Sequence, residues 1–193
     1  MLPTRPLCVA VVALAVVVAA CGNPALPKAT YPSTLNSYTL YPVTGAPANV
    51  PTALSFLSGA TRADSRFTFD VAFELNSAGA VLVYPVRLIG GGLVSTSLKR
   101  IGMQPLPGAF DGITQVPSSG YDTLSVQTVT PGTVLGVEIL DVNACYTSLG
   151  GQTMYAKMVV DSVIPTVRRI YARTVVDLNC GYHQVVPDSI PTS

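Results

Sequence analysis

The strongest constraint on the fold is an alternation of apolar and mainly polar side chains in residues 66–75 (RFTFDVAFEL). Every second residue from Phe67 to Leu75 is apolar, whereas Asp70 and Glu74 lie between the apolar positions. A period of two is typical of a β-strand with one buried face. We therefore predict a strand here, with its apolar face in a core and its two carboxylates in solvent.

Similar strand patterns recur along most of the chain. Residues 76–79 (NSAG) form a predicted turn, and residues 80–89 form the partner strand. Pro85 cannot donate a ladder hydrogen bond, so this strand needs a free side or a bulge there. Residues 104–120 are rich in Pro and Gly and are predicted to be loop. Further strands are predicted at residues 38–43, 52–57, 96–103, 122–129, 133–140, 153–163 and 167–178.

These patterns predict an all-β protein, an antiparallel β-sandwich of about 7–9 strands. No segment after residue 20 combines apolar residues at helical spacing with helix caps. Short turns at residues 130–132 and 164–166 separate the last strands. The domain resembles immunoglobulin-like and transthyretin-like sandwiches in general, and no family in particular.

The charge balance argues against nucleic acid as a partner. Only 11% of the 193 residues are charged, compared with ~25% in typical domains. Eleven basic and ten acidic residues are present, and Arg5 is the only charged residue before residue 21, so the remainder is formally neutral. A neutral chain has no electrostatic attraction to a phosphate backbone.

The N-terminus has the pattern of an export signal. Arg5 precedes an uncharged apolar run, residues 7–20, which is shorter than the ~20 residues of a membrane-spanning helix. The run ends in Val18-Ala19-Ala20-Cys21, which resembles the lipobox of bacterial lipoproteins. The resemblance implies cleavage between Ala20 and Cys21 and attachment of lipid to the Cys21 sulfur. An ordinary secretory signal with a chance cysteine is the alternative.

This pattern sets the expected domain organisation and location. Residues 1–20 form the signal, 21–35 a flexible Pro-rich tether, 36–187 the β-sandwich and 188–193 a C-terminal tail. An extended tether could reach about 40 Å. A residue other than Asp after the lipidated cysteine, here Gly22, favours the outer membrane. We expect an exported domain that two or more acyl chains anchor to a membrane.

The cysteines predict one disulfide. Cys8 is removed with the signal and Cys21 carries lipid, which leaves Cys145 and Cys180 in an oxidising compartment. A reactive or metal-binding pair is the alternative, but such sites usually have close Cys spacing or several histidines, and His183 is the only histidine. We predict that the disulfide joins the segments just outside the open end of the last hairpin.

Catalytic and cofactor motifs are absent from the sequence. There is no GxSxG, HExxH, EF-hand or phosphate-binding loop. Asp70 and Glu74 would lie about 13 Å apart on one strand, too far for a glycosidase pair. We therefore predict no enzyme activity and no cofactor or metal.

One candidate binding face is predicted on the last hairpin, on the side opposite the core. Tyr and Arg are over-represented in binding hot spots, so this face is a hypothetical docking site for an envelope protein or an acidic glycan. The alternative is a solvated face whose charges pair across strands, for example Asp161 with Arg169. The five residues of the predicted face are Tyr155, Lys157, Arg169, Tyr171 and Arg173.

The function expected from sequence is a non-catalytic binding or structural module at the cell envelope, anchored by membrane lipid. The first alternative is a carrier of a small apolar or haem-like ligand, with His183 or a Met as the haem ligand. A hydrolase ranks third. The sequence gives no prediction of oligomeric state.

Overall fold

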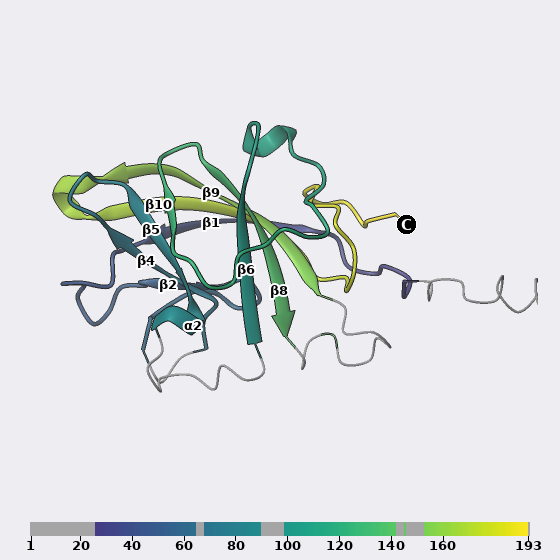
Figure 1. Cartoon of the computed structure of the whole chain (residues 1–193), viewed down its shortest axis with the longest axis horizontal. Helices are drawn as coiled ribbons and strands as arrows, with labels where there is room; N and C mark the ends of the chain where they lie inside the picture. The colour runs from purple at the N-terminus through teal and green to yellow at the C-terminus, as the bar shows by residue number, and fades with distance from the viewer. Residues whose placement is uncertain (1–25, 65–67, 90–98, 142–144, 146–152, 193) are drawn as a thin grey trace, which may run out of the picture.

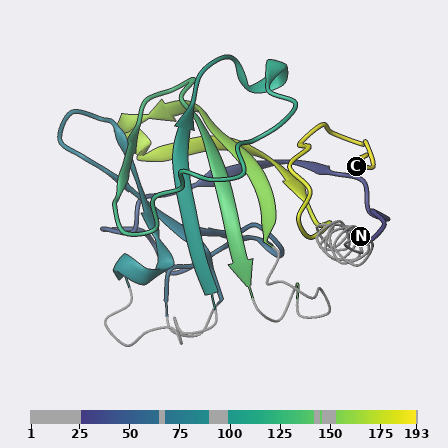
Figure 2. The same cartoon turned by 45° about the vertical axis from the view of Figure 1, so that its right-hand side comes forward.

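Two five-stranded antiparallel sheets stack face to face in this computed structural model (Figures 1 and 2). The structure describes residues 26–64, 68–89, 99–141, 145 and 153–192. The prediction of an antiparallel, all-β sandwich is confirmed. Within the described residues, no helix is both long and apolar enough to cross a membrane.

The first sheet contains the longer strands and has the order β1-β10-β9-β8-β6. All its neighbouring strands are antiparallel. Its strands in spatial order are β1 (Thr34–Leu40), β10 (Arg169–Asp177), β9 (Met154–Ile164), β8 (Val134–Asp141) and β6 (Lys99–Leu106).

The second sheet has the order β3-β2-β4-β5-β7 and is built from shorter strands. Its strands are β3 (Gly59–Thr61), β2 (Ala53–Ser55), β4 (Val71–Leu75), β5 (Val81–Pro85) and β7 (Gln127–Val129). Three helical turns complete the described structure: α2 (Val86–Ile89), η1 (Phe110–Gly112) and η2 (Pro165–Val167).

The predicted turns are present, and their residues explain them. Asn76 Oδ1 accepts hydrogen bonds from the Ala78 and Ala80 N–H groups, and Gly79 has φ +80°. Gly132 likewise has a positive φ, in the turn between β7 and β8. These conformations favour glycine because other residues place a Cβ atom too close to the backbone.

The strand predicted at residues 80–89 is shorter than expected. β7 pairs only with Val81 to Val83, so Pro85 lies beyond the last pair, where a missing N–H costs no ladder bond. The chain then turns into α2. The predicted free side at Pro85 is therefore present, and the remaining residues leave the sheet.

Apolar side chains of both sheets fill the space between them. Phe69, just before β4, and Phe73 within it belong to one cluster with Met103, Ile139 and Met158 from the first sheet, and all five are fully or almost fully buried. The apolar face predicted for β4 is thus confirmed in the described residues.

A second apolar cluster lies on the outer face of the first sheet. Val159 and Val175 project from β9 and β10 and are covered by Phe110 and Val116 from the segment after β6 and by Val185 from the C-terminal segment. This face is therefore a packed interface between the sheet and two covering segments. The covering segments, residues 107–126 and 178–192, form a third layer.

Asp70 does not lie in solvent, which corrects the prediction from its alternating position. Its side chain is fully buried, forms an ion pair with Lys99 Nζ, and accepts a 2.6 Å hydrogen bond from the Phe56 N–H. Burial raises the pKa of Asp70, and the ammonium of Lys99 opposes that rise. The pair joins the second sheet to β6 of the first.

Glu74 remains close to the surface, as predicted, but it has defined partners. Its carboxylate accepts a 2.8 Å hydrogen bond from the Thr44 N–H and lies 2.9 Å from Arg168. Partial burial acts to raise the pKa of Glu74, but these partners and the Leu75 N–H lower it overall.

Candidate functional site

Burial divides the predicted binding face of the last hairpin into two parts. Tyr155 and Lys157 are only 5% and 1% exposed, so neither belongs to an exposed docking face. The sequence analysis predicted a loop at residues 104–120. An alternating pattern of apolar residues cannot show that such a loop folds back over the sheet and buries residues of the hairpin. Arg169, Tyr171 and Arg173 remain partly exposed.

Lys157 fastens the covering segment to β9. Its Nζ donates hydrogen bonds of 2.8 Å to the Phe110 carbonyl and 2.6 Å to the Ile113 carbonyl, and lies 4.6 Å from the centre of the Phe110 ring. Burial lowers the pKa of Lys157. The role of this lysine is therefore structural.

The exposed part of the hairpin forms a strip of aromatic and basic side chains. Arg169 donates hydrogen bonds of 3.2 Å from Nε to the Tyr41 hydroxyl and 3.2 Å from Nη1 to the Tyr171 hydroxyl. Its guanidinium also lies 5.8 Å from the centre of the Tyr41 ring. We call Tyr41, Arg169, Tyr171 and Arg173 the Tyr/Arg strip. Tyr41 was not predicted because it follows β1, which only the pairing of β1 with β10 brings alongside the hairpin.

Arg173, and not Arg169, pairs with Asp161. The Arg173 guanidinium contacts both Asp161 oxygens at 2.9–3.1 Å and Asp111 at 3.4 Å. The predicted pairing of Asp161 with Arg169 is wrong because Arg169 lies opposite Ile164, three residues further along β9. Asp161 lies at the register shift between Tyr171 and Ala172, where it has no partner in the ladder and contacts Arg173 instead.

A shallow groove of about 230 Å³ borders this strip. Its lining comes from three neighbouring strands: residues 37–39 of β1, Tyr171 and Arg173 of β10, and Asp161 of β9. The groove offers an aromatic ring, a guanidinium and a carboxylate at one surface, which suits a polar partner better than an apolar one.

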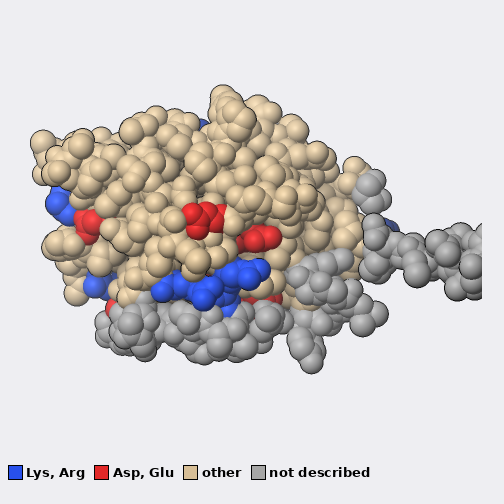
Figure 3. Space-filling view, in the orientation of Figure 1, with Lys and Arg blue, Asp and Glu red and all other residues tan. Residues whose placement is uncertain are grey.

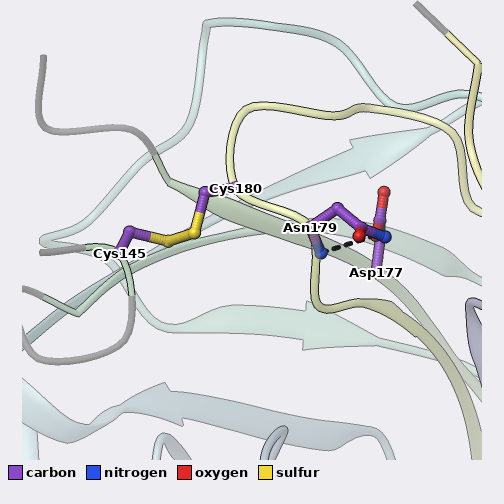
Figure 4. Close-up of a disulfide and its surroundings, with 4 residues drawn as sticks. All are labelled: Cys145, Asp177, Asn179 and Cys180. Carbon is purple, nitrogen blue, oxygen red and sulfur yellow. Dashed lines mark hydrogen bonds between the residues drawn. A yellow bond between two sulfur atoms is a disulfide. The ribbon is translucent and has the colours of Figure 1, made fainter. Parts of the chain in front are cut away.

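The predicted disulfide between Cys145 and Cys180 is present (Figure 4). The two Cα atoms lie 5.9 Å apart, and the bond joins the segment after β8 to the segment after β10. The Gly181 N–H donates a 2.8 Å hydrogen bond to the Thr153 carbonyl, just before β9. The disulfide thus fastens the end of the sheet that lies opposite the β9–β10 turn.

Asn179, next to this disulfide, binds the N-terminal segment of the domain. Its Oδ1 accepts hydrogen bonds of 2.8 and 3.1 Å from the Thr30 and Tyr31 N–H groups, and its Nδ2 donates one of 2.7 Å to the Tyr31 carbonyl. The Tyr182 hydroxyl donates a 2.9 Å hydrogen bond to the Pro27 carbonyl.

These contacts correct the predicted limits of the tether. The flexible segment was expected to cover residues 21–35, but the chain is bound to the domain from Pro27, and β1 begins at Thr34. The predicted tail at residues 188–193 is also bound as far as residue 192, because the Ser33 N–H donates to the Ser189 carbonyl and the Thr192 N–H to Gln184. Ala20 and Cys21 lie outside the described residues.

Asp177 holds the Asn179 backbone and side chain in place, and the two residues lie side by side (Figure 4). Asp177 Oδ1 accepts hydrogen bonds of 2.8 Å from the Asn179 N–H and 2.6 Å from Asn179 Nδ2. Its other oxygen is buried and has no hydrogen-bond partner within the described part of the chain. Burial raises the pKa of Asp177, and the bonds from Asn179 oppose that rise.

His183 packs against the second cluster. Its ring centre lies 4.0 Å from that of Tyr155, and its buried Nδ1 atom has no hydrogen-bond partner among the residues that the structure describes. His183 also lines a surface groove of about 370 Å³ with Gln115 and Gln184. Across the described part of the chain, no three His, Cys, Asp or Glu residues are grouped closely enough to hold a metal ion.

Together, the fold and the site define a β-sandwich module with a disulfide bond. Two segments cover part of the outer face of its first sheet, and the Tyr/Arg strip remains partly exposed. No protein-family model, curated protein or solved structure matches this chain. Function has therefore to be inferred from the geometry of the chain itself.

Proposed function

We propose that this chain is a lipid-anchored, non-catalytic binding module of the bacterial cell envelope, which presents the Tyr/Arg strip to a protein or acidic glycan. The observation that carries the proposal is the arrangement of the two ends of the first sheet. The N-terminal segment is bound beside Asn179 at one end, whereas Arg169 lies beside the β9–β10 turn at the other (Figure 1).

The bound N-terminal segment supports a short anchor. Cys21 lies six residues before Pro27, which is the first of the described residues with a hydrogen bond to the rest of the domain. At no more than ~3.6 Å per residue, those positions span at most roughly 22 Å. A lipid on Cys21 would hold the domain close to the membrane, and not at the end of a 40 Å tether.

The geometry of the strip supports recognition of a polar partner. Hydrogen bonds to Arg169 hold the Tyr41 and Tyr171 rings, so little side-chain entropy is lost when they bind a partner. Arg169 donates to hydroxyls and not to a carboxylate in these bonds, so its positive charge remains for an acidic group. Carboxylates are the natural partners of a guanidinium.

A non-catalytic role is supported by how the described charged groups are used. Asp70 and Lys99 join the sheets, Lys157 holds the covering segment, and Arg173 pairs with Asp161. Figure 3 shows one face of the molecule, on which uncharged residues dominate. Catalytic acids and bases, in contrast, usually gather in a cleft with perturbed pKa values.

A ligand carrier is the second candidate, and it is favoured by His183, which lines a groove and whose buried Nδ1 atom has no hydrogen-bond partner among the described residues. Titration with haem, followed by Soret absorbance, tests this candidate. A saturable change in the wild-type chain that His183→Ala abolishes would support haem carriage. Equal spectra for the two proteins would dismiss it.

In-cell crosslinking followed by capture of the chain tests the binding proposal. The double variant Arg169→Ala/Tyr171→Ala should recover the crosslinked partner at least about ten-fold less well, because a hot-spot residue contributes roughly 2 kcal/mol or more. The matched control is Tyr31→Ala/Arg87→Ala, which removes one exposed Tyr and one exposed Arg elsewhere. Equal recovery from the strip variant and the control would contradict the proposal.

A further inference from the structure

Exposed apolar side chains gather where the described chain begins. Leu26 is 36% exposed and Ile190 is 50% exposed, and both line a groove of about 650 Å³. We call this feature the anchor-end groove. The residues that matter for its chemistry are Leu26, Lys28, Ala29, Tyr182, Ile190 and Pro191.

We propose that the anchor-end groove rests on the lipid bilayer, with Leu26 and Ile190 inserted at the boundary between headgroups and acyl chains. This inference rests on the proposed lipid at Cys21. Cys21 lies five residues before Leu26, so even an extended connection spans no more than roughly 18 Å. A lipid on Cys21 therefore keeps the groove within reach of the membrane surface.

The chemistry of the groove matches such a surface. Leu26 and Ile190 gain from leaving water, since apolar side chains enter the acyl boundary favourably. The Lys28 side chain lies at the same groove and can place its ammonium among lipid phosphates. Tyr182 is only 6% exposed, and its hydroxyl bonds to the Pro27 carbonyl, so its part in the groove is to hold the lining in place.

The groove is also held rigidly, so contact with lipid would orient the whole domain. Tyr182 and Asn179 bind residues 27–31 from the C-terminal side, and Ser33 bonds to Ser189. The N-terminal and C-terminal segments that line the groove are therefore held together by hydrogen bonds. Because the anchor is covalent, the bilayer would always be present at this site at a high effective concentration. A freely diffusing partner protein would not have this advantage.

A tryptophan scan of two positions tests the inference, because the chain contains no Trp. The variants are Ile190→Trp in the groove and Val167→Trp at η2, a residue that is 52% exposed at the far end. Each full-length lipidated protein is placed in vesicles of brominated phosphatidylcholine and phosphatidylglycerol. I190W fluorescence should shift to shorter wavelength and be quenched several-fold more than V167W fluorescence.

The mass of the N-terminal peptide of each preparation separates the two proposals. If Cys21 carries no lipid, the proposed function fails, and the inference fails with it. If Cys21 carries lipid but I190W is quenched no more than V167W, the inference alone is overturned. Lipid on Cys21 together with selective quenching of I190W supports both.

Discussion

At the scale of single residues, buried charges determine how the layers are joined. The alternating pattern assigns Asp70 to the polar side of a strand, but it cannot show that Lys99 lies on that side. The ion pair forms only after the two sheets stack, and its carboxylate is fully buried. Sequence reasoning could identify the face of Asp70 but not its partner.

Removing the cation should be costly. Lys99→Met leaves the Asp70 carboxylate buried without its counter-charge and should reduce the free energy of unfolding by about 3–5 kcal/mol at neutral pH. Urea denaturation measures this loss. The control, Lys28→Met, removes an exposed lysine and should change stability by less than ~0.5 kcal/mol. Equal denaturation midpoints for the two variants would show that the pair does not stabilise the fold.

Asp177 should give the stability a definite pH dependence. Its pKa is raised in the folded state, so the native state binds the proton more tightly than the unfolded state. Stability from this carboxyl is therefore lost as pH rises from about 4 through the folded-state pKa. Asp177→Asn should be more stable relative to wild type at pH 7 than at pH 4, in urea titrations. A relative stability that is higher at pH 4 would contradict the assigned direction.

At the scale of elements, the period-two pattern locates strands but not what covers them. The hairpin strands were predicted within one or two residues of β9 and β10, because their apolar alternation is long. The register shift beside Tyr171 and the folding of residues 107–126 over the sheet were missed. Both depend on long-range packing, which leaves no local period in the sequence.

The disulfide was predictable because the export pattern left two cysteines to pair. The double variant Cys145→Ser/Cys180→Ser opens a 35-residue separation and should lower the free energy of unfolding by about 4 kcal/mol in the chain-entropy model. Thermal unfolding of the variant, compared with the oxidised and reduced wild-type chain, measures the effect. The variant should match the reduced protein; a match to the oxidised protein would mean that the bond does not stabilise the domain.

At the scale of the whole molecule, the two ends of the first sheet have different chemistry. One end holds the N-terminal segment, the disulfide and the anchor-end groove, and the other holds the β9–β10 turn with Arg169 nearby (Figures 1 and 2). In the proposed function, the anchor holds one end of the sheet at the membrane, and the Tyr/Arg strip near the other end faces away from it. The sequence could suggest an anchor, but the bound segment from Pro27 required the fold, since Asn179 and Tyr182 lie far along the chain.

Mass spectrometry of the N-terminal peptide from protein purified out of bacterial membranes tests the central claim most directly. The account predicts a peptide that begins at Cys21 and carries a diacylglyceryl group on sulfur. It also predicts that Cys21→Ala removes the lipid and releases the chain from the membrane fraction. A peptide that begins at Met1, or one that begins at Cys21 with a free thiol, would contradict the claim that this β-sandwich is a lipid-anchored module.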